Sequence, residues 1–565
     1  MILFIGVDNM KKRVGILVDD IIVSNWAHEL IKLSKFSSNY EITTIIIDDV
    51  NKDGNNIFSK TLNYIKRRGF MKFISLSLIL LIRQIESIYI KNTHYKNFYK
   101  KFNLSDFGLD QINVKPELSK NGLIYRYNKE DLKKIKSANL DLIVLVRSGV
   151  IKGEILNICP LGVISMHFAD NDINRGGPPG FWEVYQRQSR TGFIIQRLRE
   201  ELDGGDVLYK GFVSTSWMYT LNLVNVAETT SPFLNLLLNK VTSNSEEVIV
   251  HDKKPYSHQL FTLPNPLIIM HYIFRTLVHL FKKLLRKVSR KAYRWNVAYQ
   301  FVDNWKDVPL WRSQKIPNPR DRFLADPFVI KKNGKHYCFV EDFSFLSKKG
   351  SISVFEITKN GSTNLGYALV EDFHLSYPFL FEQKGELYML PETNDKKEIR
   401  AYKCINFPLE WKLHKVLMEN VSAADTIVFE KNDKWWLMSN LSTSYVGDHG
   451  SELHVYYSDD PFDGDWISHS DNPVIFDPLR ARNGGLICDK NNLYRVFQRH
   501  GFDMYGESIG ISKILNIDTD AYEEKKLFEI NANFFNNALG THTYNFTDGL
   551  VVFDYVEISK TKTGI

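Results

Sequence analysis

The sequence has few cysteines, and their spacing excludes two classes of structural site. Four cysteines occur among 565 residues, and none of them belongs to a CxxC pair. This pattern indicates neither a zinc site nor a dense disulfide scaffold, so we predict no metal site and a reducing, cytoplasmic location. The opening residues, MILFIGVDNMKKRV, lack a basic region before their apolar run and a small-residue cleavage site. We therefore expect no signal peptide.

Other absences limit the ligands and the membrane topology. No GxGxxG motif follows the first predicted strand, so a dinucleotide site is not indicated. A net charge of +7 is modest for this length and does not indicate nucleic-acid binding. The apolar run Met71–Ile82 is too short to cross a bilayer as a helix. We predict that this run is a buried helix segment.

The first part of the chain, residues 10–245, alternates strand and helix patterns, which is typical of an α/β Rossmann-like domain with a mainly parallel sheet. Ligands of such sheets bind beyond the carboxyl ends of the strands, where the segment after Val146 and the residue His167 are expected. The expected strands are Arg13–Asp20, Glu41–Asp49, Leu140–Val146 and Gly162–His167, and the expected helices are Ser24–Lys35, with Ser24 as its N-cap, and Asn128–Asn139.

Residues 264–302 are predicted to form a basic amphipathic linker helix. No acidic residue occurs between Leu267 and Val302, and apolar residues recur there at helical spacing. Two interpretations stay open. The segment 267–295 lies on an anionic membrane surface, at its inner face, or it packs between domains with a solvated basic side. The basic residues are Arg275, Lys282, Lys283, Arg286, Lys287, Arg290, Lys291 and Arg294.

Residues 303–565 repeat one pattern, a strand, a tight polar turn and a second strand. The repeat length is that of a propeller blade, and five copies predict a five-bladed β-propeller. The copies begin at Ala325, Ser376, Ala423, Ala481 and Thr541.

Each copy places one polar or aromatic side chain near the start of its first strand. We expect these five side chains to ring one mouth of the central channel and to bind glycan. Asp326 and Asp425 also leave open a pair of hydrolytic carboxylates or a central metal, although no ligand spacing demands the metal. A purely structural propeller is a further alternative. The five residues are Asp326, Tyr377, Asp425, Asn483 and His542.

The stretch from Ser165 to Asp206 reads SMHFADNDINRGGPPGFWEVYQRQSRTGFIIQRLREELDGGD. Its histidine, the Gly/Pro loop and the LDGGD turn resemble, in this order, the catalytic core of the folate-dependent formyltransferases. Moving a formyl group onto an amine requires a proton relay and donors for developing oxygen charge, and a histidine beside a carboxylate meets the first need.

The formyltransferase resemblance implies roles for residues of the first domain. His167 is the catalytic histidine, Asp203 the catalytic aspartate, and Ser165 stands where the family usually has an asparagine that binds the formyl oxygen. The donor implied is N10-formyltetrahydrofolate. The loop expected to line its pocket consists of Arg147, Ser148, Gly149, Val150 and Ile151.

The second half resembles the N-terminal domain of glucosamine inositolphosphorylceramide transferases, where ADPF-type blades recur, and the propellers of glycoside hydrolases. Because the chain carries a propeller in place of a basic tRNA-binding barrel, the resemblances imply an enzyme that formylates a nucleotide- or lipid-linked amino sugar, with glycan bound by the propeller. The alternatives are a carbohydrate-binding propeller with a degenerate formyltransferase-like domain, and a propeller glycosidase.

Overall fold

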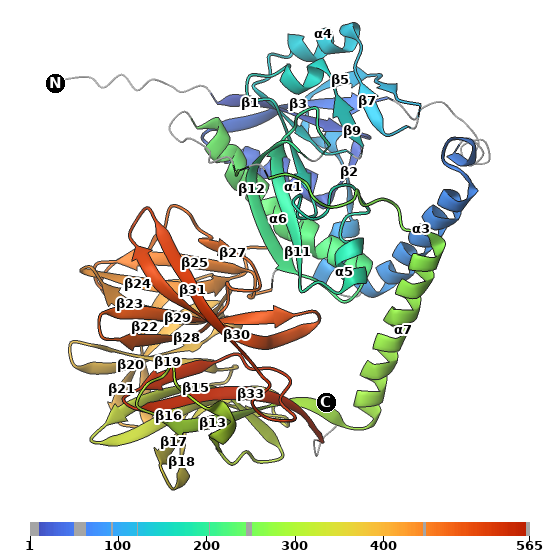
Figure 1. The fold of residues 1–565 in the computed structure, drawn as a ribbon. Helices are drawn as coiled ribbons and strands as arrows, with labels where there is room; N and C mark the ends of the chain where they lie inside the picture. The colour runs from blue at the N-terminus through green and yellow to red at the C-terminus, as the bar shows by residue number, and fades with distance from the viewer. Residues whose placement is uncertain are drawn as a thin grey trace, which may run out of the picture. The chain divides into compact units, whose positions relative to one another are not determined.

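The computed structural model describes residues 11–49, 64–91, 94–120, 122–147, 149–202, 204–243, 251–252, 254–444 and 448–560. Ser148 and Asp203, two of the predicted site residues, lie outside this part of the chain. The chain divides into two compact units, coloured from blue to green and from green to red in Figure 1. We call Met1–Thr276 with Ser444–Val446 unit 1, and Leu277–Thr443 with Gly447–Ile565 unit 2.

Unit 1 is built on a seven-stranded sheet with the order β12-β11-β10-β8-β1-β3-β5. Strands β10, β8, β1, β3 and β5 run parallel, while β11 and β12 are antiparallel. The predicted Rossmann-like α/β fold is thereby confirmed. The strands are β1 (Lys12–Val18), β3 (Tyr40–Asp48), β5 (Asp110–Val114), β8 (Leu142–Leu145), β10 (Val163–His167), β11 (Arg190–Arg197) and β12 (Asp206–Ser214).

The central strands are apolar on both faces because helices cover both. Ile143 of β8 packs in a cluster with Ile135 of the helix α4, while its neighbours Leu142 and Val144 are equally buried. Helices α1 and α6 pack against each other and against β3. The helices are α1 (Asn25–Ser34), α3 (Phe70–Lys91), α4 (Lys129–Ser137), α5 (Phe181–Gln186), α6 (Tyr219–Thr242) and α7 (Pro266–Val288).

Two small sheets and short turns complete unit 1. β2 pairs with β4, and β6, β7 and β9 form a three-stranded sheet. Asn128 caps α4 through its side chain, but Ser24, which the sequence predicts to cap α1, makes no side-chain cap hydrogen bond. The remaining elements are β2 (Ile22–Ser24), β4 (Lys101–Asn103), β6 (Glu117–Leu118), β7 (Ile124–Arg126), β9 (Val150–Lys152) and the 3-10 turns His94–Tyr99, Leu104–Phe107 and Glu154–Asn157.

Helix α3 differs from the prediction for its sequence. The run Met71–Ile82, expected to be a buried segment, belongs to a 22-residue helix whose apolar side is largely exposed. Among the described residues this helix is the only one long and apolar enough to cross a membrane, although 28% of its apolar window is buried in the structure. The helix continues past Ile82 because Arg83, Gln84 and Glu86 are good helix formers.

Helix α7 is shorter than the predicted linker helix. It ends at Val288, and Lys291–Phe301, predicted to be helical, is instead strand β13, which pairs with the last strand of unit 2. The alternation of apolar and polar residues in KAYRWNVAYQF suits such a strand. The boundary between the two units falls inside α7, after Thr276.

The described residues of unit 2 form five antiparallel sheets of four or more strands (Figure 1). The first strands of the sheets, β15, β19, β23, β28 and β32, contact one another in succession, and β32 contacts β15. One sheet joins β13 from the start of the unit to β32 and β33 from its end. The arrangement is propeller-like.

Each predicted hairpin is present with its turn at the expected residues. The strands are β13 (Lys291–Phe301), β14 (Gln314–Lys315), β15 (Arg322–Lys332), β16 (Lys335–Ser344), β17 (Lys349–Thr358), β18 (Gly361–Leu369), β19 (Ser376–Gln383), β20 (Glu386–Glu392), β21 (Glu398–Asn406), β22 (Glu410–Glu419), β23 (Ala423–Lys431), β24 (Lys434–Leu441), β25 (Glu452–Ser458), β26 (Ile467–Ser468), β27 (Ile475–Phe476), β28 (Asn483–Asp489), β29 (Asn492–Gly501), β30 (Met504–Ile517), β31 (Tyr522–Asn531), β32 (Tyr544–Thr547) and β33 (Leu550–Lys560).

Candidate functional site

His167 ends strand β10, at the carboxyl edge of the parallel part of the sheet in unit 1. Its Nε2 atom lies 3.2 Å from the backbone oxygen of Asn174, and the Asn174 amide donates to Glu183 at 2.9 Å. Because a carbonyl oxygen only accepts, Nε2 carries the hydrogen in this contact. The contact holds the half-buried imidazole in one orientation.

Ser165 and His167 share one face of the sheet because they are two residues apart on a strand. The Ser165 hydroxyl donates to the backbone oxygen of Met166 at 3.3 Å, a long bond that is easily exchanged for another acceptor. Gln196 of β11 lies opposite Ser165, and its side-chain oxygen accepts from the backbone of Gly205. The backbone of Gly205 thus lies beside β11, the strand that pairs with the strand of His167, while the predicted pairing of His167 with Asp203 stays a prediction.

In the loop predicted to line a folate pocket, fewer side chains are available to contact a ligand than the sequence suggests. The Arg147 guanidinium pairs with Asp48 and with Asp19 at 3.1 Å and stacks on the Tyr125 ring, and its side chain is 1% exposed. Ile151 is buried in the core between the sheet and α4. These two side chains support the fold, so a ligand at this loop meets the backbone of Gly149 and the half-buried Val150.

Gly149 and Gly176 hold backbone conformations that only glycine accepts easily. Gly149 has a φ of +96°, and an added Cβ would lie 2.6 Å from the Tyr125 ring. Gly176 opens the GGPPG loop with a φ of +104°, and a Cβ added there would lie 2.2 Å from the backbone oxygen of Phe261. The close approach at this loop is thus made by the chain itself.

A pocket of about 270 Å³ lies beside the LDGGD turn, lined in part by Gly204 and Gly205. Lys210 in its wall bridges Asp170 and Asp172 at 2.5 and 2.8 Å. The Arg175 guanidinium lies over the Tyr256 ring in the same wall. Charged groups of both signs and an aromatic ring suit a polar ligand of mixed charge. The lining side chains that carry charge are Asp172, Arg175, Glu201, Lys210, Asp252 and Lys254.

In unit 2 the predicted ring of polar side chains comes from one repeated backbone feature. In the first three sheets of the repeat, the register of the first hairpin shifts at one residue: Asp326, Tyr377 or Asp425. Each of these residues has a φ between 46° and 49°. In the fourth sheet the break falls between Asn483 and Gly485. Such bulges bend a strand and redirect a side chain, and left-handed backbone at non-glycine residues is found often at functional sites.

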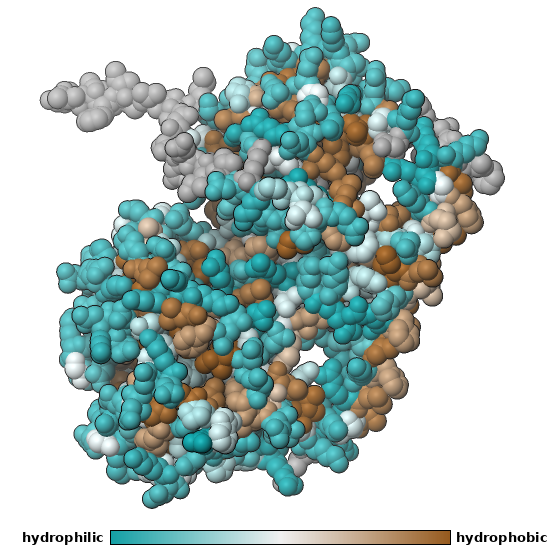
Figure 2. Space-filling view, viewed as in Figure 1, coloured by the Kyte–Doolittle hydropathy of each residue, from teal (hydrophilic) through white to brown (hydrophobic). Residues whose placement is uncertain are grey.

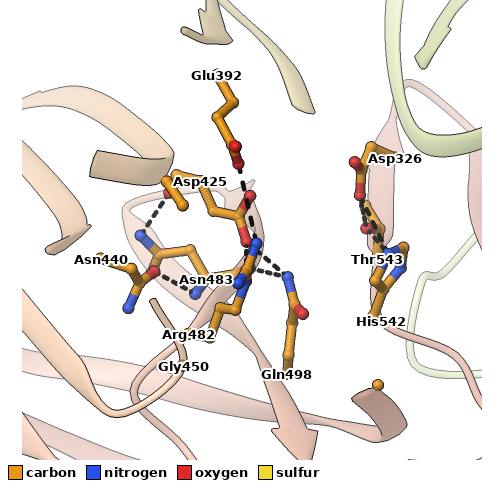
Figure 3. Close-up of polar contacts among 12 residues, drawn as sticks. Asp326, Glu392, Asp425, Asn440, Gly450, Arg482, Asn483, Gln498, His542 and Thr543 are labelled. Atoms are coloured by element: carbon orange, nitrogen blue, oxygen red, sulfur yellow. Dashed lines mark hydrogen bonds and ion pairs between the residues drawn. The ribbon is translucent and has the colours of Figure 1, made fainter. Parts of the chain in front are cut away.

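Asp326 belongs to a buried group at the junction of the first and fifth sheets (Figure 3). Thr543 donates to the Asp326 carboxylate at 2.9 Å, and His542 lies 3.6 Å from the same oxygen. His542 also contacts Asp554 of β33 at 2.5 Å. Asp326, His542 and Asp554 stand close enough together to hold a metal ion, whereas the sequence considered Asp326 with Asp425.

Asp425 belongs to a second group, drawn on the other side of Figure 3. Its carboxylate accepts from Arg482 at 2.6 Å and from Gln498 at 2.8 Å, while its backbone oxygen accepts from the Asn483 amide. Arg482 also lies 3.9 Å from Glu392. Asp425 and Asn483 are buried, whereas Arg482 and Glu392 keep 15% and 16% of their side chains exposed and so mark the accessible end of the cluster.

Crowded carboxylates raise one another's pKa in this cluster. Burial, followed by the charge of Asp425, raises the pKa of Glu392 to about 8, even though Arg482 opposes the shift. Burial raises the pKa of Asp326 to about 6 against the attraction of His542, and burial with Asp326 raises that of Glu341 well above its usual range. Burial also raises the pKa of the Tyr377 hydroxyl, which makes no hydrogen bond within the described residues. The cluster keeps some carboxyl groups protonated near neutral pH.

Aromatic rings border the same cluster. Trp295 stacks on the His542 ring at a centroid distance of 3.8 Å, and Arg482 lies over the Tyr505 ring, which is 42% exposed. Aromatic faces beside acidic and amide groups form a surface that can bind sugar rings, since one face of a sugar is apolar and its edges donate hydrogen bonds. Trp295, Arg482, Tyr505 and Asp554 were not selected from the sequence. Asp554 could have been, because an acid inside the apolar run VVFDYV needs a partner.

The described geometry brings the five predicted propeller residues into one buried region, with partners from the second strands of the same hairpins. Asn483 takes a structural position, since its amide links Asp425 and Met438 backbone oxygens and its own N–H donates to Asn440. Tyr377 lies within reach of the charges of Asp326 and Asp425. The second-strand partners are Glu341, Glu392, Asn440, Gln498 and Asp554.

Comparison with known proteins supports both resemblances. Residues 312–548 match the family described as Glucosamine inositolphosphorylceramide transferase 1, N-terminal. The chain is 37% identical over 207 residues to Glucosamine inositolphosphorylceramide transferase 1 of Arabidopsis thaliana, covering 36% of this chain and 27% of that protein. It is 25% identical over 208 residues to methionyl-tRNA formyltransferase of Bacillus subtilis (strain 168), covering 36% of this chain and 63% of that protein. The chain therefore spans less than two thirds of either relative.

Solved structures of both kinds are also similar to parts of the chain. A phosphoribosylglycinamide formyltransferase from Bacillus Halodurans matches with 16% identity and a TM-score of 0.28, covering 42% of this chain and 97% of that one. The catalytic domain of the Coprinopsis cinerea GH62 alpha-L-arabinofuranosidase matches with 11% identity and a TM-score of 0.31, covering 47% of this chain and 97% of that one. The sequence matches to formyltransferases and to the N-terminal domain of glucosamine inositolphosphorylceramide transferases confirm the two similarities predicted from the motifs.

Proposed function

We propose that this chain transfers a formyl group from N10-formyltetrahydrofolate to the amine of a nucleotide- or lipid-linked amino sugar, and that unit 2, as a closed five-bladed propeller, binds glycan. The observation that carries the first part is the fixed imidazole of His167 at the carboxyl end of β10. It stands where ligands of such sheets bind, and the Gly/Pro loop and the LDGGD turn follow it in the formyltransferase order.

Each group near β10 has a defined task in this proposal. His167 takes the proton that the amine loses as the new C–N bond forms, and passes it to the donor nitrogen that the formyl group leaves, while the contact of Nε2 with the Asn174 carbonyl holds the ring in place. Ser165, on the same sheet face, turns its hydroxyl from Met166 toward the oxygen on which negative charge develops. Asp203 is assigned by resemblance alone. The pocket beside Gly204 receives the acceptor, whose amine and carrier phosphate match its mixed charges.

The donor supplies the carbon unit when bound, and the loop after β8 would hold it. The fit depends on the tight turn at Gly149 and on the backbone around Val150, since Arg147 and Ile151 are engaged within the protein. An Arg147 substitution is therefore expected to lower stability before it lowers donor affinity.

Formyl transfer is tested by incubating the full chain with the donor and a panel of amino-sugar nucleotides, with mass spectrometry of the products. We expect a formylated sugar, and a loss of about 100-fold or more in His167→Asn because a general base contributes at least this much. His414→Asn in the exposed strand β22 is the matched control. No product with any sugar, or full activity of His167→Asn, contradicts the proposal. Calorimetry with the folate donor separates the degenerate-domain alternative, which predicts no donor binding.

Glycan binding by unit 2 rests on the accessible end of its cluster, where Arg482 lies between Glu392 and the Tyr505 ring, and Tyr505 contacts Trp295. Carboxylates and amides there accept hydrogen bonds from sugar hydroxyl or ammonium groups. Glycan-array binding that is lost in Tyr505→Ala but kept in Tyr293→Ala, a comparably exposed tyrosine, is the expected result. Equal binding of both variants contradicts the assignment.

Glycoside hydrolysis is a second candidate for unit 2, favoured by one observation. Glu392 is kept protonated at neutral pH near the ionised pair of Asp425 with Arg482, as an acid and a base in one site require. Hydrolysis of arylglycosides that is lost in both Glu392→Gln and Asp425→Asn, and retained in Glu386→Gln, would establish it. A lack of hydrolysis across a broad panel leaves binding as the role of unit 2.

A further inference from the structure

Helix α7 carries an apolar stripe that the described residues of the chain leave exposed. Seven residues at intervals of three and four recur along its whole length, so they share one face of the helix. Their exposed fractions run from 54% at Met270 to 81% at Leu267. Figure 2 shows apolar surface along this helix. The stripe consists of Leu267, Met270, Phe274, Leu277, Phe281, Leu284 and Val288.

The opposite side of α7 is fixed by contacts within each unit. In unit 1, Tyr272 is buried and donates to Glu86 of α3 at 2.5 Å. In unit 2, His279 and Lys283 contact Asp503 at 3.0 and 3.2 Å. A helix held from behind in this way presents the stripe outward rather than turning it inward.

Positive charge flanks the stripe on both sides. With 100° between successive residues, Lys282 and Lys287 lie roughly 110° to either side of it, and both are exposed. No acidic residue occurs between Leu267 and Val302. Five Lys or Arg residues within the helix exclude it as a membrane span. Basic flanks beside an apolar face are instead the pattern of a helix that lies in the headgroup layer of an anionic bilayer.

We propose that α7 docks this protein on an anionic lipid surface, with the stripe in the acyl boundary and Lys282 and Lys287 at the lipid phosphates. The charge around the stripe selects this occupant. A second copy of the chain would place these lysines beside one another across the contact, where they repel, and a soluble apolar peptide would leave them unpaired. The proposal is independent of formyl transfer.

Vesicle co-sedimentation tests the docking. We expect the full chain to bind vesicles of phosphatidylcholine with about one third phosphatidylserine, and to bind pure phosphatidylcholine at least about tenfold more weakly. Phe274→Ser/Phe281→Ser is expected to lose about tenfold or more in affinity, because both rings leave the acyl boundary. The matched control is Phe36→Ser/Leu346→Ser, which removes apolar groups elsewhere that are even more exposed.

The contribution of the lysine charges to vesicle binding is tested by a separate pair of variants. Lys282→Glu/Lys287→Glu is expected to weaken binding about tenfold or more, whereas Lys412→Glu/Lys525→Glu, two exposed lysines on the sheets, is expected to leave binding unchanged. Absence of binding to anionic vesicles, or equal binding by the stripe variant and its control, overturns the proposal. Self-association in sedimentation velocity that the stripe variant abolishes, without vesicle binding, assigns the stripe to a second copy instead. Binding that resists alkaline carbonate extraction refutes an interfacial position.

Discussion

Glu392→Gln is expected to remove much of the pH dependence of stability in unit 2. Glu392 has its pKa raised from 4.5 to about 8 by burial and by the charge of Asp425. A carboxyl group whose folded pKa is raised contributes stability that is full below pH 4.5 and is lost as the pH rises through about 8. The wild-type unit should therefore be more stable in mild acid than at pH 8.

The size of the effect follows from this shift. Linkage for one proton gives a loss of about 3 to 4 kcal/mol in unfolding free energy between pH 5 and pH 8. Glutamine keeps the shape of the side chain and carries no proton to lose, so the variant should lack this part of the loss. A smaller pH dependence remains, because the pKa values of Asp326 and Glu341 are raised as well.

The assay should report on unit 2 alone. Denaturant unfolding read by pulsed hydrogen exchange and mass spectrometry on peptides from β20 to β24 meets this need. Glu386→Gln is the matched control, because this exposed glutamate stands on the same strand and pairs with Lys403 at the surface. It should change stability by less than about 0.5 kcal/mol at either pH. If Glu392→Gln loses stability with pH as steeply as the wild type, the buried-acid account of the cluster is wrong.

Three further predictions follow from single contacts. Tyr377→Phe should change the unfolding free energy by less than about 1 kcal/mol in denaturant unfolding, since the buried hydroxyl has no hydrogen bond among the described residues; a large loss of stability would contradict this. Gly149→Ala should lower stability in thermal unfolding by about 2 kcal/mol or more through its left-handed backbone and the clash with Tyr125, and an unchanged Tm would refute the strain. Arg495→Met should cost about 3 to 5 kcal/mol in denaturant unfolding because it leaves the buried Glu524 charge without its partner, whereas wild-type stability would show that Glu524 is solvated.

Local signals in the sequence predict the hairpins of unit 2 well. The turn residues Asn333, Lys384, Asn432, Lys490 and Asp548 all adopt the left-handed backbone that tight turns of this kind require. Such turns depend on a few neighbouring residues, so the sequence alone locates them. The register of each hairpin then brings its polar residues to the same level.

Long-range packing accounts for what the sequence does not predict. Composition makes α3 apolar, but whether its face is covered depends on distant elements, and most of it is not. Arg147 reads as a ligand residue at a strand end, yet Asp48 from another strand neutralises it. In the other hairpins, the second-strand residue follows the first-strand residue at a longer, regular spacing. Asp554 follows His542 at a shorter spacing, so the repeat pattern does not reveal it, although its contact with His542 completes the cluster.

The repeated left-handed bulge also bears on how unit 2 can change its chemistry. Because the kink is a property of the backbone, Asp326, Tyr377 and Asp425 stand at matching places although their side chains differ in charge and size. Under the proposed glycan binding, a substitution at one of these places changes the groups offered to the ligand on the same backbone kink. Related chains could thus diverge in ligand preference through a handful of point changes on an unaltered framework.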